Sequence, residues 1–297
     1  MKRHFKIALL VACLALFMIP LVGCHQSTSN GSKKIQVVSS VNFYGDAAQK
    51  VVGKYGHNTS IINSDVDPHD FEPTTNNAKE VARANVVIAN GIGYDDWMKE
   101  LIHNAGNDHQ QDINVGALMH KKDGDNEHIW YDPETMDHLV DRLVTIYSKL
   151  DPDHRDYFKK NAQEYKNEWG KTQQLIKKLS KNSHGQSVAT SEPVFDYSLD
   201  AFGYKLKDYG FSNAIEKGVD PSVNDIAELQ SDMRNHKIAF FVNNTQSDSP
   251  VVTQMVKYAK KYNVPILNVS ETAPRGQNYM QWMTNQYREL EKIQNQQ

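Results

Sequence analysis

Short β-rich runs that alternate with helical patterns are the feature that most limits how this 297-residue chain can fold. In the first half, strands are predicted at 35–41 and 86–90, each followed by a helical pattern. In the second half, the same alternation predicts strands at 187–190, 238–242 and 264–269. Strands that are each followed by a helix favour α/β layers in which the strands are largely parallel.

Two further helical patterns separate these two groups of strands. Residues 136–150 place their apolar side chains on a single helical face. Residues 153–180 contain no proline and one glycine, Gly170, and a helix of that length is on the order of 40 Å long. We therefore predict an α/β protein with two lobes of mostly parallel sheet flanked by helices, joined by a long rigid linking helix. The alternative is a single α/β domain with one long outer helix.

These patterns also predict where the parts of the chain begin and end. The N-terminal lobe is expected at 35–150 and the linking helix at 151–183, where Asp151 and Pro152 restart the chain. The C-terminal lobe is expected at 184–297.

The first 34 residues have the composition of an export signal and a tether. Three basic residues precede an apolar run at 7–19, which is the layout of a secretory signal and is too short to span a bilayer comfortably. Residues 21–24, Leu-Val-Gly-Cys, resemble the lipobox of bacterial lipoproteins. This resemblance implies a signal peptide at 1–23, diacylation of Cys24, and a flexible tether at 24–34. The alternative is an ordinary secreted protein whose signal contains a cysteine.

Charge and cysteine content exclude several classes of function. The chain carries 33 basic and 36 acidic residues, and loss of residues 1–23 removes three basic and no acidic ones, which leaves 30 against 36, or −6. This balance does not favour nucleic-acid binding. Of the two cysteines, Cys13 leaves with the signal and Cys24 carries the lipid. The mature protein therefore has no thiol for a disulfide, a nucleophile or a metal.

Two histidines lie in motifs that restrict their backbone or place them at the start of a helix. His69 lies in the sequence Asp-Pro-His-Asp-Phe-Glu-Pro at 67–73, where both prolines stiffen the chain. His128 lies in the sequence Glu-His-Ile-Trp-Tyr-Asp-Pro at 127–133, just before a predicted helix. Imidazole is the commonest protein ligand for borderline metals, so both are candidate metal ligands.

Two glutamates occupy comparable positions in the second half of the chain. Glu192 follows the strand predicted at 187–190, and Glu271 follows the strand predicted at 264–269. Ligands of open α/β sheets bind beyond the carboxyl ends of the strands, so both lie where a site in an inter-lobe crevice is expected. Each of these residues taken alone is more typical of a solvated or capping side chain. The four together support the metal-site hypothesis.

With these motifs in place, residues 24–297 resemble the cluster A-I substrate-binding lipoproteins of bacterial zinc/manganese ABC importers. The most specific parts of the resemblance are 67–73 and 128–133, and 190–197 is similar to the third-ligand loop of that family. The family architecture has two α/β lobes and a rigid linking helix. The metal ligands that the resemblance implies come in pairs from the two lobes: His69, His128, Glu192 and Glu271.

The chain departs from the family pattern at two places. Many members have histidine where this chain has Glu192, although other members share the glutamate. Residues 241–246 replace a loop that often carries a glutamate, which puts any role of residue 244 in doubt. Asp67, Asp70 and Glu72 are candidates for accepting the free imidazole N–H, with loop solvation as the alternative.

The function that follows is capture of one divalent transition metal ion, Mn²⁺ or Zn²⁺, by an extracytoplasmic, membrane-anchored monomer. The resemblance implies delivery to a cognate ABC permease and its ATPase, with only a small movement between the lobes. Four protein donors suit carriage better than catalysis, since catalytic zinc keeps a position for water, so no enzyme is expected. Two carboxylates favour Mn²⁺ slightly. The alternatives are a surface-anchored metal-dependent hydrolase and an adhesin.

Overall fold

Two four-stranded parallel sheets form the framework of the protein. The computed structural model describes residues 34–63 and 71–296, all of which belong to one compact unit. The first sheet has the strand order β2-β1-β3-β4 and the second has the order β6-β5-β7-β8. The strands of the first sheet are β1 (Ile35–Val41), β2 (Gly56–Ile62), β3 (Val86–Ala89) and β4 (Gln111–Asn114). Those of the second are β5 (Ser187–Thr190), β6 (Lys205–Lys207), β7 (Phe241–Asn244) and β8 (Ile266–Val269).

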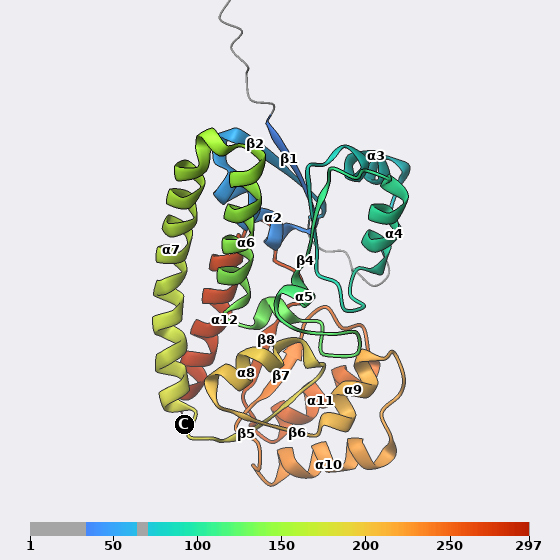
Figure 1. The fold of residues 1–297 in the computed structure, drawn as a ribbon. Coiled ribbons are helices and arrows are strands. Elements are labelled where there is room, and N and C mark those ends of the chain that lie inside the picture. Colours follow the sequence, from blue (N-terminus) through green and yellow to red (C-terminus); the bar gives the residue numbers. More distant parts are fainter. Residues whose placement is uncertain (1–33, 64–70, 297) are drawn as a thin grey trace, which may run out of the picture. The chain divides into compact units, whose positions relative to one another are not determined.

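Helices cover both faces of the first sheet (Figure 1). Alternate residues of β3 therefore enter different cores: Val86 and Ile88 join the large central core, whereas Val87 and Ala89 join a smaller one. The central core is completed by α2 (Asn42–Val52) and α6 (Thr135–Leu150), and the smaller one by α3 (Thr75–Arg83) and α4 (Asp96–Ala105).

The second sheet repeats this arrangement. Phe241 packs with side chains of three helices, whereas its neighbour Val242 joins the central core. These three helices are α9 (Tyr209–Glu216), α10 (Val223–Arg234) and α11 (Pro250–Lys261). Two shorter helices complete the fold: α8 (Asp196–Phe202) follows β5, and α5 (Val115–Leu118) follows β4.

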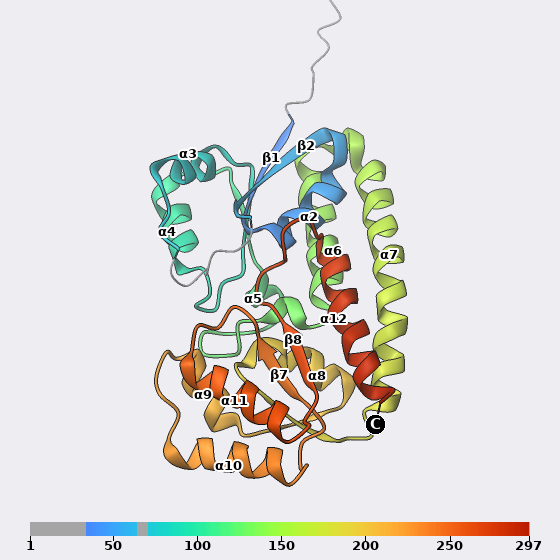
Figure 2. The same ribbon diagram turned by 180° about the vertical axis from the view of Figure 1, so that it is seen from behind.

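A long helix and the C-terminal helix connect the two sheets. The long helix is α7 (Arg155–Asn182), and α12 (Tyr279–Gln294) lies alongside it in both views (Figures 1 and 2). Trp169 of α7 contacts Tyr279 of α12, with ring centroids 5.3 Å apart. Trp282 of α12 in turn lies 5.7 Å from Phe43 of α2. The central core is therefore continuous between the first and second sheets.

The fold class predicted from the sequence is confirmed, with differences at particular elements. The strand expected at 238–242 is β7, which begins only at Phe241, although Ile238 and Phe240 are already buried. The helical pattern expected after the first strand is α2, which begins at Asn42, directly after β1, and is followed by a 3₁₀ turn at Gly53–Tyr55. Three strands, β2, β4 and β6, were not predicted, and all three lie at sheet edges. Across residues 34–63 and 71–296, no helix combines the length and the apolar character needed to cross a membrane.

Candidate metal-binding site

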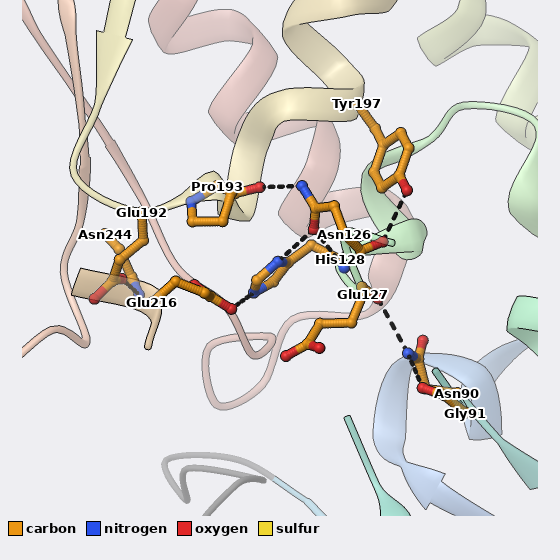
Figure 3. A network of polar contacts seen from close by, with 10 residues as sticks. All are labelled: Asn90, Gly91, Asn126, Glu127, His128, Glu192, Pro193, Tyr197, Glu216 and Asn244. Atoms are coloured by element: carbon orange, nitrogen blue, oxygen red, sulfur yellow. Dashed lines mark hydrogen bonds and ion pairs between the residues drawn. The ribbon is translucent and has the colours of Figure 1, made fainter. Parts of the chain in front are cut away.

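Loops that follow the strands of both sheets meet around His128 (Figure 3). His128 directly precedes a 3₁₀ turn at Ile129–Tyr131, which starts the approach to α6. Glu192 follows β5, and the 3₁₀ turn at Pro193–Phe195 begins immediately after it. The carboxyl ends of parallel strands gather at one edge of a sheet, which explains why these loops converge.

The imidazole of His128 is buried, and Asn126, two residues earlier in the chain, hydrogen-bonds to it. The side chain is 1% exposed and packs edge-on against Trp130, with ring centroids 5.2 Å apart. Nδ1 lies 2.8 Å from Oδ1 of Asn126, and the same oxygen accepts the backbone N–H of His128 at 3.0 Å.

The second lobe fixes the orientation of the Asn126 amide. Asn126 Nδ2 donates to the backbone carbonyl of Pro193 at 2.7 Å, and a carbonyl oxygen can only accept. Oδ1 must therefore face His128, so Nδ1 of the imidazole carries the proton. In the neutral ring the lone pair is then on Nε2, which is the nitrogen that such a histidine offers to a metal.

A second hydrogen bond holds the Asn126 loop to the second lobe. The Tyr197 hydroxyl donates to the backbone carbonyl of Asn126 at 2.7 Å. Burial raises the pKa of Tyr197 to about 12, with nearby carboxylates adding to the effect, so the hydroxyl remains a donor at neutral pH. The ammonium of Lys121 lies 4.5 Å from the centre of the Tyr197 ring and covers it.

Glu192 is oriented by the end of strand β7. Its Oε2 accepts a hydrogen bond from Nδ2 of Asn244, and the backbone N–H of Asn244 donates to Oγ of Ser191 at 2.9 Å. Asn244 is buried. The sequence put any role of residue 244 in doubt. In the structure Asn244 does have a role, because its amide positions the Glu192 carboxylate.

Glu271 lies just beyond β8 in a turn organised by Gln246. Oε1 of Gln246 accepts the backbone N–H groups of Glu271 and Thr272, at 2.7 and 2.9 Å. Burial raises the pKa of Tyr131 well above its usual value, and the Glu271 carboxylate adds to this shift. The Tyr131 hydroxyl donates to the carbonyl of Ser270, the residue before Glu271, at 2.6 Å, so this phenol lies beside the Glu271 turn.

Glu216 is a neighbour of His128 that the sequence did not indicate. Its Oε1 lies 3.9 Å from Nε2 of His128, and its side chain is 21% exposed (Figure 3). It is the last residue of α9 and lies in no motif. Asn126 was missed as well, although its place in a polar loop two residues before His128 was a usable signal.

Part of the predicted site lies outside the described residues. His69, Asp67 and Asp70 fall within residues 64–70, and Cys24 falls within residues 1–33. Glu72 is described and is exposed. In the part of the chain that the structure describes, no three His, Cys, Asp or Glu side chains come together closely enough to hold a metal ion. The four-ligand set of His69, His128, Glu192 and Glu271 therefore stays a prediction.

The fold matches that of solved periplasmic metal-binding proteins. The periplasmic zinc-binding protein TroA from Treponema pallidum superposes with a TM-score of 0.72 at 17% identity, over 88% of this chain and 99% of TroA. The Mn-bound periplasmic metal-binding protein from Candidatus Liberibacter asiaticus gives 0.68 at 18% identity, over 88% of this chain and 100% of that protein. At these identities the likeness concerns the fold.

Sequence comparison identifies the family. The family model described as zinc-uptake complex component A, periplasmic (ZnuA), matches residues 37–293. The metal ABC transporter substrate-binding lipoprotein FimA of Streptococcus parasanguinis is 25% identical, over 94% of this chain and 95% of FimA. The manganese-binding lipoprotein MntA of Bacillus subtilis is 26% identical, over 82% of both chains. The chain belongs to the zinc-uptake complex component A family, a class of metal-binding, substrate-binding proteins of ABC transporters.

Proposed function

We propose that this protein captures one divalent transition metal ion outside the cytoplasm and delivers it to the permease and ATPase of an ABC importer. The lipid anchor expected at Cys24 keeps it at the outer face of the membrane. The ion is held between the lobes by one imidazole pair and one carboxylate pair: His69, His128, Glu192 and Glu271.

The observation that carries this proposal is the state of the His128 ring. The ring is buried, its Nδ1 is committed to Asn126, and the lone pair of Nε2 faces a carboxylate of the second lobe. A histidine fixed in this way needs little reorganisation to bind a metal, and fixing of ligands by such neighbours is typical of metal sites.

Manganese is the metal we expect this protein to carry. Carboxylate oxygens suit Mn²⁺ better than they suit softer metals, and the proposed set contains two of them and no thiolate. The name of the Bacillus subtilis relative, a manganese-binding lipoprotein, supports this choice, whereas TroA is titled a zinc-binding protein.

The test is elemental analysis of the protein purified without chelator. The wild-type protein is expected to carry about one equivalent of Mn²⁺ or Zn²⁺, and Glu192→Ala and Glu271→Ala to lose most of it. Asn126→Ala leaves all proposed ligands in place but releases the His128 ring, so metal affinity should fall by about 10–100-fold. Glu100→Ala, an exposed carboxylate on α4, serves as the control. Metal content unchanged in Glu192→Ala and Glu271→Ala contradicts the proposed ligand set.

A further inference from the structure

The outer face of α11 and the adjacent end of α10 gather four positive charges. Lys257, Lys260 and Lys261 lie on α11, Arg234 is the last residue of α10, and all four residues are exposed. Among residues 34–63 and 71–296, the ion pairs of basic side chains involve other residues and none includes these four. Their charges are therefore available to a partner.

Two tyrosines of α11 lie among these charges. The ring centroids of Tyr258 and Tyr262 are 4.7 Å apart, and the ammonium of Lys261 lies 5.4 Å from the centre of the Tyr262 ring. A hydrogen bond with Tyr258 lowers the pKa of Tyr262, and the positive charges of Lys261 and Arg234 lower it further. Arg234 therefore belongs to the same surface as the end of α11. We refer to Arg234, Lys257, Tyr258, Lys260, Lys261 and Tyr262 as the α11 face.

The charge of the α11 face is opposite to that of the protein as a whole. From residue 233 to residue 262 the chain has five basic residues and one acidic residue, Asp248, which precedes α11. The acidic residue nearest Arg234 in the chain is Asp232, which is buried and already paired with two other lysines. The chain without residues 1–23 has 36 acidic and 30 basic residues. An anionic partner is thus repelled by the whole protein and attracted to this face.

The parallel strands place the α11 face away from the metal-binding loops. α11 connects the parallel strands β7 and β8, so it runs back from the carboxyl edge of the sheet and its last turn lies near the amino edge. Glu192 and Asn244 lie at the carboxyl edge. The start of β1 lies at the opposite end of the molecule from α10 and α11 (Figures 1 and 2). A partner on the α11 face therefore leaves the proposed metal ligands free.

We infer that the α11 face is a contact surface for a lipid bilayer with anionic headgroups. Headgroup phosphates attract lysine and arginine, and tyrosine favours the interface because its ring is apolar and its hydroxyl is polar. The inference rests on the lipid anchor of the proposed function. The anchor holds the protein beside the membrane, so even a weak surface contact is populated.

Two attachments set the orientation of the protein on the membrane. The tether precedes β1 in the first lobe, and the α11 face belongs to the second lobe. Both lobes are then held near the bilayer, and the protein presents the same side to the membrane each time it meets a permease.

The experiment uses the mature, acylated protein in vesicles, with one environment-sensitive dye. The mature chain has no free thiol once Cys24 is acylated, so Gln254→Cys provides a single position for the dye. Gln254 is exposed on α11 and shares a helical face with Lys257 and Tyr258. The dye emission should shift to the blue on vesicles of equimolar phosphatidylcholine and phosphatidylglycerol but not on phosphatidylcholine alone, and high salt should reverse the shift.

Removal of two cations tests the electrostatic part of the contact. Lys257→Gln combined with Lys261→Gln should lower the equilibrium constant for contact by about tenfold or more, because each lysine near an anionic bilayer strengthens binding several-fold. Lys177→Gln combined with Lys181→Gln removes the same charge at the same spacing from exposed positions on α7, and should leave the shift unchanged. Thermal unfolding shows whether both double variants are folded, and both should keep the metal content of the wild type.

A dye at Glu100→Cys, an exposed position on α4, measures non-specific contact and should not respond. An equal shift at both labelled positions, or an unchanged shift after removal of Lys257 and Lys261, overturns the inference. A shift produced by soluble polyglutamate but not by anionic vesicles also overturns it, and would assign the α11 face to an acidic protein partner.

Flotation separates failure of this inference from failure of the proposed function. Protein that floats with neutral vesicles has its anchor, so a dye at Gln254→Cys that then ignores anionic vesicles refutes the inference alone. If the protein does not float with neutral vesicles, the anchor is wrong, and flotation with anionic vesicles decides the inference by itself.

Discussion

Buried polar side chains in this protein differ in whether their hydrogen-bonding capacity is met. Asn90 is fully buried and accepts the Tyr44 hydroxyl at 2.6 Å, while its amide donates to the carbonyl of Glu127 at 3.0 Å. Asp95 is buried too, and its two oxygens accept the backbone N–H groups of Asn90 and Gly91. Asp196, the first residue of α8, is different, because its buried Oδ1 has no hydrogen-bond partner among the described residues.

Replacing Asp196 with Asn should stabilise the protein at alkaline pH. Burial raises the pKa of Asp196 from 3.8 to about 7, so the folded state holds this proton more tightly than the unfolded chain does. The free energy of unfolding of the wild type therefore falls as pH rises from about 4 to about 7. Asp196→Asn removes this loss and should be more stable by about 1–3 kcal/mol at pH 8, with the difference vanishing near pH 4.

Urea unfolding at pH 4, 6 and 8 measures this effect. Asp200→Asn, which makes the same change at an exposed position on the same helix, is the control. A difference between Asp196→Asn and the wild type that stays constant with pH would mean that the carboxylate does not titrate as stated.

At the level of elements, the long helix α7 is stabilised on one side only. Its 28 residues place a line of side chains in the core, and Nε1 of Trp169 donates to the carbonyl of Pro133 at 3.0 Å. The buried residues of this line are Phe158, Ala162, Tyr165, Trp169, Thr172, Ile176 and Leu179. Since a helix of this kind depends on tertiary packing, its outer face is free to vary.

Gly170 lies in α7 where a side chain can be added without a clash. A Cβ built there meets no atom within 4 Å, and glycine in a helix interior costs about 0.5–1 kcal/mol relative to alanine. Gly170→Ala should therefore raise the free energy of unfolding by about that amount and the melting temperature by roughly 2–4 °C. Circular dichroism during heating measures it.

Gly91→Ala is the contrasting variant. Gly91 has φ of 75°, and a Cβ there would lie 2.2 Å from the Asn114 amide, so this change should destabilise the protein. A lower melting temperature for Gly170→Ala would show that α7 packs against something at that position.

On the scale of the whole unit, hydrogen bonds and a shared core join the two sheets. The Tyr131 hydroxyl donates to the carbonyl of Ser270 at 2.6 Å, and the Tyr279 hydroxyl donates to the carbonyl of Trp130 at 2.6 Å. Ser198 of α8 donates to the carbonyl of Tyr131 at 2.7 Å. Opening a hinge here would break buried hydrogen bonds and expose aromatic side chains, each at a cost of about 1–3 kcal/mol.

Metal binding should therefore leave the dimensions of the protein nearly unchanged. We expect the radius of gyration from small-angle X-ray scattering to be the same, within error, for chelator-treated and metal-loaded protein. His128→Ala with added metal is the control for non-specific effects. A clear decrease on loading would indicate that the lobes close like a hinge and that the bonds at Tyr131 do not restrain them.

Much of the fold was predictable because burial on both faces leaves a clear apolar pattern. The strands β1 and β5 were predicted at both ends, and α7 within two residues. The unpredicted strand β4, Gln-Asp-Ile-Asn, is polar because it lies at a sheet edge. Edge strands obtain their pairing from the neighbouring backbone, which no side-chain pattern records.

The sequence by itself determined the alternation of strands and helices, the linking helix, and which histidines and glutamates follow the strands. Only the tertiary structure decided that α12 returns to pack beside α7, that the Pro193 carbonyl orients Asn126, and that Glu216 faces His128. The physical reason is the distance along the chain over which each kind of interaction acts. Periodicity and local motifs act over a few residues, whereas Glu216 lies 88 positions from His128 in the chain and reaches it only because the shared core brings the end of α9 beside the loop that carries His128.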